Sequence, residues 1–220
     1  MNKVYSSGLE YRALAENMLS LCGIGSCTDE NIIVPEFVGG SKVISVDSFA
    51  FRKNESVRSI SLPDSVDYIG AEAFAWCKNL CSVSFNNVIH ISERAFMGCD
   101  SLVSAHVGAR LNIVGKKAFA YCPSLKSITL PDSLETLGAS VFEGCRNLQS
   151  VVLPRLLKTI ENGTFYACCN LSSINIPENL GYIDEFAFAY CISLENFALS
   201  ARTIINQYAF FEAHAGRMVS

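Results

Sequence analysis

Phenylalanine recurs at a nearly fixed interval through most of the 220-residue chain, and this period constrains the fold more than any other feature. Each step is 22 or 23 residues long, through Phe51, Phe74, Phe96, Phe119, Phe142, Phe165, Phe188 and Phe210. One unit of this length cannot bury its own apolar face, whereas stacked units can, each contacting only its neighbours. The period therefore predicts a solenoid in which every unit forms one turn.

Other columns keep the same register as the phenylalanines. Apolar residues stand five before and six, nine and eleven after almost every Phe. The position three after it is a cysteine in six units, namely Cys77, Cys99, Cys122, Cys145, Cys168 and Cys191. Because a buried cysteine behaves as a small hydrophobe, we expect this column to lie in the core as free thiols.

The unit around Phe119 shows how one turn is built. Its segment from Leu125 to Leu130 alternates, so that Ile128 and Leu130 point inward while Ser127 and Thr129 point outward. This pattern predicts a short strand, and strands of successive units would pair in parallel. Pro131 ends the strand because it has no N–H. The segment 137–142 is predicted to be a second short extended or turn segment on the other side of the turn.

Two steps of the period are one residue short. They fall at residues 86–91 and 200–205, and both lack the proline that follows the strand in four other units: Pro63, Pro131, Pro154 and Pro177. Gly108 also replaces this proline, although its unit keeps 23 residues. The missing residue is therefore expected to come from the loop after the strand.

Both ends of the chain depart from the repeat. Residues 9–14 and 18–22 are compatible with a β-hairpin, but a helix over 11–21 would place Tyr11, Leu14, Met18 and Leu21 near one face. Intrinsic propensity favours the helix. The pattern stops after Phe210. An uncapped edge there would expose unpaired strand groups, so we expect either that the chain is a piece of a longer protein or that this end meets a partner, for example by self-association through the C-terminal edge.

The repeated residues carry a resemblance to a known family. The unit with Val114, Ala118-Phe119, Cys122, Leu125, Ser127-Ile128 and Leu130-Pro131 resembles the BspA-type leucine-rich repeats, and residues 32–46 resemble that family's first repeat. The resemblance implies a right-handed, horseshoe-like leucine-rich-repeat solenoid that is β-rich, with short turns or 3₁₀ segments and a parallel strand ladder. Relatives with a stretch similar to residues 23–29 imply an N-terminal β-hairpin cap. The predicted organisation is a cap region over 1–30, repeats over 31–210 and a C-terminal tail or truncated cap over 211–220.

Composition excludes several classes of protein. Half of the residues are apolar and only 17% are charged, which argues against disorder. The net charge of −4 argues against nucleic-acid binding, which needs clustered cations. We expect no membrane insertion because no apolar run reaches 18 residues. No signal peptide is recognisable, so the location stays unknown, although the resemblance implies a cell-surface or secreted protein.

Nothing in the sequence points to catalysis. His90, His106 and His214 fall in different columns and units, so no thiol has a predicted base. The chain lacks a Cys-x-x-Cys pair and known nucleotide-binding or nucleophile motifs. We therefore predict a protein that is not an enzyme and holds no cofactor or metal. Two points stay open: Cys22 and Cys27 could form a disulfide in a secreted protein, and Cys81 and Cys169 are expected to be the most reactive thiols.

The outward positions of the predicted strands form the candidate binding face. They are small, neutral and rich in hydroxyl groups: Ser59, Ser61, Ser82, Ser84, Ser104, His106, Ser127, Thr129, Ser150, Ser173, Asn175 and Asn196, with Arg58, Lys126, Gln149 and Glu195 beside them. One interpretation is that small residues suit a crowded concave sheet. The other is a recognition surface for a protein or a glycan, although scarce aromatics argue against stacking on sugars. Trp76, Tyr121, Tyr166 and Tyr190 either line another face or pack between turns.

The sequence thus predicts a non-catalytic macromolecular binding module. The resemblance implies protein–protein or cell-surface and host interaction of an adhesin-like kind. The alternatives are an intracellular interaction scaffold and a repeat module of a larger surface protein.

Overall fold

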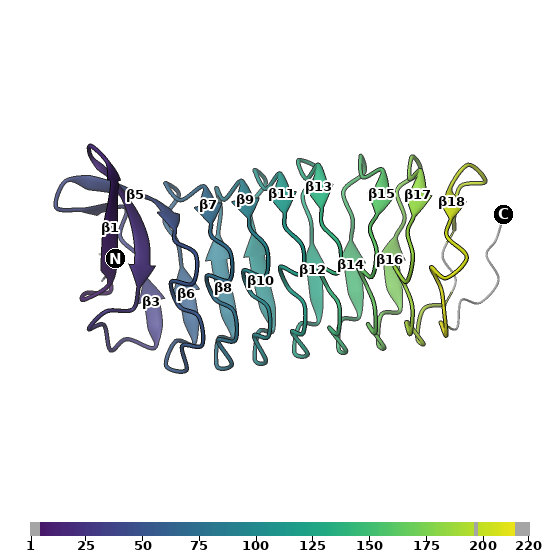
Figure 1. The fold of residues 1–220 in the computed structure, drawn as a ribbon, viewed down its shortest axis with the longest axis horizontal. Coiled ribbons are helices and arrows are strands. Elements are labelled where there is room, and N and C mark those ends of the chain that lie inside the picture. The colour runs from purple at the N-terminus through teal and green to yellow at the C-terminus, as the bar shows by residue number, and fades with distance from the viewer. Residues whose placement is uncertain (1–4, 196–197, 214–220) are drawn as a thin grey trace.

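The computed structural model describes residues 5–195 and 198–213, which form a solenoid built from eighteen short strands. Figure 1 shows the turns stacked along the long axis, with a hairpin at the N-terminal end. The predicted leucine-rich-repeat solenoid with parallel ladders is confirmed. The described residues contain turns but no helix of any kind.

Each complete turn contributes one strand to each of two columns, and all pairs within the columns are parallel. The first column forms what we call the strand face: β3 (Asn31–Ile33), β6 (Ser59–Ser61), β8 (Ser82–Phe85), β10 (Ser104–Val107), β12 (Ser127–Thr129), β14 (Ser150–Val152) and β16 (Ser173–Asn175). The second forms the back column: β5 (Ser41–Val46), β7 (Tyr68–Ile69), β9 (His90–Ile91), β11 (Ile113–Val114), β13 (Thr136–Leu137), β15 (Thr159–Ile160), β17 (Tyr182–Ile183) and β18 (Ile204–Ile205).

The phenylalanine column forms a continuous stack of rings through the core. The rings from Phe51 to Phe188 are at most 2% exposed, and Phe210 is half-buried. Neighbouring centroids are 5.1 to 6.0 Å apart and their planes differ by 2 to 14°. Because stacked aromatic rings add to the free energy of burial, the column links each turn to the next.

The cysteine column also links neighbouring turns. Each of its six thiols donates a hydrogen bond to the carbonyl oxygen of the Phe in the preceding turn, as from Cys122 to Phe96 at 3.2 Å. Burial raises the pKa of Cys77 and of Cys191 to about 12, so both stay protonated donors at neutral pH. The column is structural, as expected. Cys22 and Cys27 are free thiols in this structure, and Cys81 and Cys169 are half-buried.

The chain turns around each core Phe through two residues of left-handed backbone, a feature that the sequence did not reveal. Around Phe119 these are Lys117 at φ 57° and Tyr121 at φ 56°. Such backbone is unfavourable for side chains other than glycine. It is stabilised here because alternate N–H groups donate to the next turn, with Lys117 bonded to the Ala139 oxygen at 3.0 Å.

The N-terminal cap is a β-hairpin, so the hairpin rather than the helix is confirmed. β1 (Glu10–Ala15) and β2 (Met18–Gly23) pair antiparallel, and β2 pairs in parallel with β5. A helix would leave the outer edge of β5 without a ladder partner, whereas β2 satisfies that edge. The short strand β4 (Phe37–Val38) also pairs with β5. At the other end, β18 is paired with β17, and self-association through that edge stays a prediction.

The Asp47 carboxylate links the hairpin to the first turn through hydrogen bonds. Arg12 donates two hydrogen bonds to Asp47, at 2.8 and 2.7 Å, and the Ser20 hydroxyl donates a third at 2.6 Å. The Ser45 hydroxyl donates in turn to Ser20. The bonds from Arg12, more than those from Ser20, hold the pKa of Asp47 below its ordinary value of 3.8 despite partial burial.

Asp47 gives the cap a pH dependence. A carboxylate with a lowered folded-state pKa stabilises the fold above its unfolded pKa and loses that contribution as pH falls through the folded pKa. The free energy of unfolding of wild type should therefore exceed that of Asp47→Asn at pH 7, and this difference should shrink below pH 3.8. Urea titrations at several pH values measure it. Asp67→Asn, at an exposed position, is the control, and a difference that persists unchanged into strong acid would contradict the argument.

The Phe stack should dominate mid-solenoid stability. Phe119 is fully buried between the rings of Phe96 and Phe142. Phe119→Ala should lower the free energy of unfolding by roughly 3–5 kcal/mol, because it removes a large side chain and leaves a cavity. Denaturant titration measures this, with the exposed Lys116→Ala as control. An unchanged midpoint for Phe119→Ala would show that the stack does not carry the core.

Candidate binding surface

The predicted outward side chains lie on the strand face, and their exposure varies along the solenoid. Ile128 and Leu130 are buried while Ser127 and Thr129 are exposed, as the alternation predicts. Ser59, Ser61, Ser82 and Ser84 are only half-buried near the N-terminal end, whereas Ser104, His106, Lys126 and Gln149 are exposed in the middle. Ser150 is half-buried and Ser173 and Glu195 are exposed. Asn196 lies outside the described residues.

Some predicted binding residues already hold partners within the chain. Arg58 donates to Glu30 at 2.8 Å, and the Ser59 hydroxyl donates to the Asn31 side chain at 2.7 Å. The Asn175 amide spans to the neighbouring turn, accepting from the Leu153 N–H at 2.6 Å and donating to the Leu153 oxygen at 3.0 Å. These side chains therefore link turns to one another, which lowers their availability for a ligand.

The strand ladder is interrupted in the middle of this face. One sheet runs from β3 to β10 and a second from β12 to β16, and no ladder joins β10 to β12 across this described stretch. We call this interruption the seam. It forms an open depression of about 610 Å³, with Ser104, His106, Ser127 and Thr129 on its rim. The strand face is thus not uniform, because its hollow and its most exposed polar residues coincide.

Two departures from the repeat lie next to the seam. Ala105 stands where five other turns carry Ile or Val, and this inward position of β10 is only half-buried. Gly108 replaces the proline, and a Cβ there would overlap the carbonyl oxygen of Asn86. Only glycine permits this close approach to the shortened loop of the preceding turn. The end of β10 is therefore packed against its N-terminal neighbour, on the side away from β12.

The seam offers hydrogen bonds rather than reactive groups. Its rim carries three hydroxyl groups and one imidazole, and the exposed Lys126 directly precedes Ser127 in the sequence. The edges of β10 and β12 facing it add backbone groups that no ladder pairs. In the described part of the chain, no three His, Cys, Asp or Glu side chains gather as metal ligands. That same part has no helix of the length and apolarity that a membrane span requires.

The aromatic residues singled out in the sequence pack between turns. A Cβ at Gly98 would overlap the Trp76 ring, and one at Gly144 would approach the Tyr121 ring, so each ring covers a glycine of the next turn. The Tyr121 hydroxyl also donates to Glu143. Tyr166 and Tyr190 meet edge to face at 5.4 Å. Packing between turns, rather than a separate aromatic face, accounts for these contacts.

Fold and surface together define a leucine-rich-repeat solenoid with an interrupted strand face. The family described as "BspA type Leucine rich repeat region" matches in six copies over residues 23–126 and 112–215. Because these matches cover most of the chain, the protein belongs to this family of repeat proteins. The comparison with curated proteins returns no match.

Solved structures with this fold come from several bacteria. The leucine-rich repeat protein TpLRR of T. pallidum is 27% identical with a TM-score of 0.81, over 88% of this chain and 91% of that one. A leucine-rich repeat protein from Bacteroides ovatus is 24% identical with a TM-score of 0.68, over 90% of this chain and 59% of that one. The pneumococcal vaccine antigen PcpA is 17% identical with a TM-score of 0.51, over 92% and 76%. The latter two similarities concern the fold alone.

Proposed function

We propose that this chain is a non-catalytic module that binds a protein ligand on its strand face, centred on the seam. The observation that carries the proposal is the coincidence of the hollow between β10 and β12 with exposed polar side chains. Side chains such as those of His106, Ser127 and Thr129 make no hydrogen bond or ion pair with any described residue, so a ligand would not have to displace an internal partner.

The chemistry of the face favours a protein over a glycan. Its exposed apolar groups are aliphatic, namely Val103 beside β10 and Val152 on β14, and the residues that line the seam include no Phe, Tyr or Trp. Aliphatic side chains and hydroxyl groups suit a peptide surface, whereas sugars are commonly recognised by stacking on aromatic rings. Membership of a repeat family supports a binding role, because stacked repeats form extended surfaces for recognition.

We further propose that the module acts in adhesion or host interaction at the cell surface. The family resemblance motivates this adhesin-like role. The alternatives are an intracellular interaction scaffold and a repeat module within a larger surface protein. Measuring the location of the chain distinguishes the intracellular scaffold from the proposed surface role.

A matched pair of threonines tests the binding surface. Thr129 on β12 lines the seam, whereas Thr136 on β13 is also exposed but lies on the back column. The biotinylated chain is used as bait on an array of host extracellular-matrix proteins, and the affinity for any bound protein is then measured. Thr129→Arg should weaken it about tenfold or more, because the long cation fills the hollow, while Thr136→Arg should leave it unchanged. Equal binding by both variants would exclude the seam as the site.

Protease shaving tests the location. Intact source cells are treated with protease, and the chain is detected with an antibody. Loss of the signal from unbroken cells is expected for a surface protein. Protection until lysis would reject the adhesion role and leave the intracellular scaffold.

A further inference from the structure

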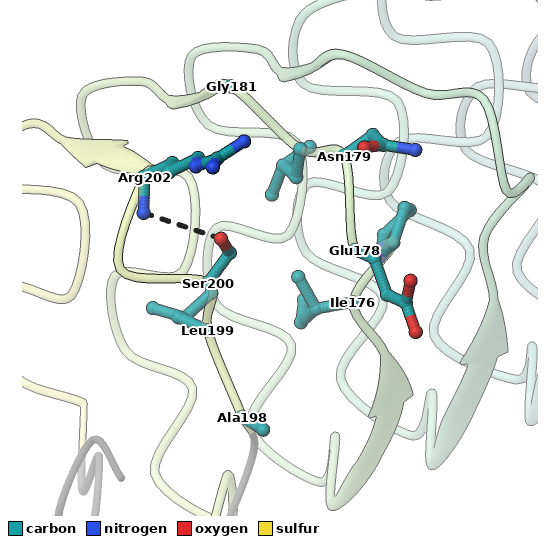
Figure 2. Close-up of a pocket in the computed structure, with 10 residues that line it drawn as sticks. Ile176, Glu178, Asn179, Gly181, Ala198, Leu199, Ser200 and Arg202 are labelled. Carbon is teal, nitrogen blue, oxygen red and sulfur yellow. Dashed lines mark hydrogen bonds between the residues drawn. The ribbon is translucent and has the colours of Figure 1, made fainter. Parts of the chain in front are cut away.

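The second shortened loop borders a pocket next to the end of β16 on the strand face. Residues 176–181 form a full-length loop with its proline, whereas residues 198–202 of the next turn lack the proline and one residue. Between the two loops opens a pocket of about 550 Å³ (Figure 2). Ile176, Leu180 and Leu199 provide apolar walls, and Asn179, Ser200 and Arg202 provide polar groups. We call this the loop pocket.

The first shortened loop shows how such a gap can be closed from within. There the Asn86 amide donates to the Asp64 carboxylate at 3.1 Å, and the Asn87 amide donates to the Asp64 carbonyl oxygen at 3.0 Å. At the loop pocket, the Thr203 hydroxyl bonds the Leu180 oxygen at 2.9 Å, but no pair of amides spans the gap.

An arginine in an earlier turn, Arg155, has an acidic partner, whereas Arg202 has none among the described residues. Arg155 pairs with Asp132 of the preceding turn, with Nε and Oδ2 3.0 Å apart. The guanidinium of Arg202 forms no ion pair with any described residue; its backbone N–H donates to the Ser200 hydroxyl oxygen. Figure 2 shows the Arg202 side chain reaching toward the facing loop, while the Glu178 carboxylate points away from the gap. The pocket thus presents an unpaired cation beside aliphatic walls.

We propose that the loop pocket binds a peptide carboxylate that lies next to an aliphatic side chain. The planar guanidinium of Arg202 can donate two parallel hydrogen bonds to one carboxylate. The Ser200 hydroxyl and Asn179 amide add neutral donors, and Leu199 and Ile176 receive the aliphatic group. A free chain end and an Asp or Glu side chain share this chemistry. No aromatic ring lines the pocket, which favours a peptide over an acidic sugar.

Nuclear magnetic resonance titration of the full ¹⁵N-labelled chain tests the site with three short acetylated peptides. The first is Ser-Leu-Ile with a free C-terminal carboxylate, the second is the same peptide amidated, and the third is amidated Leu-Glu-Ile. We expect the Arg202 side-chain signal and the Leu199 amide to shift saturably with a carboxylate peptide, at a Kd of about 1 mM. The neutral amide should not bind. The first and third peptides distinguish a chain end from an acidic side chain.

Two exposed arginines provide the matched variants. Arg202→Gln should weaken carboxylate binding at least about tenfold, because a neutral amide replaces the charged guanidinium. Arg155→Gln, which changes a cation already paired with Asp132, should leave binding unchanged. Unfolding midpoints near wild type verify that both variants fold. Thr129→Arg in the seam should have no effect here, so failure of this site is distinguishable from failure of the proposed function.

Several outcomes would overturn the assignment. Equal binding of the neutral amide would show that the carboxylate is not recognised, and unchanged binding by Arg202→Gln would show that its guanidinium is not the receptor. Binding of glucuronate, but of none of the three peptides, would replace the peptide with an acidic sugar. An absence of saturable shifts with every probe would reject the pocket as a carboxylate site.

Discussion

Stacking of the core phenylalanine rings is the interaction on which the rest of this structure depends. Within the residues that the structure describes, the two strand columns are each interrupted once, between β10 and β12 on the strand face and between β13 and β15 on the back column. The ring stack crosses both places, at 5.2 Å between Phe96 and Phe119 and at 5.6 Å between Phe142 and Phe165. Backbone hydrogen bonds around the same Phe turns also continue there, as from the Phe96 N–H to the Ala118 oxygen at 2.8 Å. Because the Phe turns hold the stack together at these places, the strands can part without breaking the solenoid.

The parts of the fold that the sequence predicted are those in which a residue type is dictated by burial. Phe, Cys and aliphatic columns repeat because each faces the same core position, so their inward direction could be inferred from periodicity alone. The left-handed corners were not predictable in this way. Residues such as Lys53, Glu72 and Trp76 adopt positive φ although none of them is glycine. Hydrogen bonds to the next turn impose this backbone conformation, and the residue types at these three positions do not indicate it. Gly98 was the available signal, because it follows Trp76 by 22 residues and its lack of a Cβ makes room for that ring.

The candidate surface was predicted as a set of columns, but the structure divides those columns into unequal parts. Ser59 and Asn175 occupy equivalent outward positions to Ser127 and Thr129, yet the first two are bonded to neighbouring turns and the last two border an open hollow. A column pattern treats every turn alike, so it cannot show where the ladder opens. The relevant differences lie at inward and loop positions, in the small Ala105 and in Gly108 packed on Asn86. Departures from the repeat, rather than the repeat itself, therefore mark where a ligand could be received.

The two shortened loops also differ from each other, although both depart from the repeat in the same way. Each of these loops is one residue shorter than the loop of the preceding turn, beside which it lies. Asn86 and Asn87 bridge the first gap to Asp64, and this internal solution uses the hydrogen-bonding groups of both loops. The second gap has aliphatic walls and an arginine without an acidic partner among the described residues. A cation at such a site gains most from a partner that brings both a carboxylate and an apolar group, because desolvation of the walls strengthens the charged hydrogen bonds. The two shortened loops therefore differ in the side chains that flank each gap: amides bridge the first, whereas the second borders a pocket whose arginine has no acidic partner among the described residues.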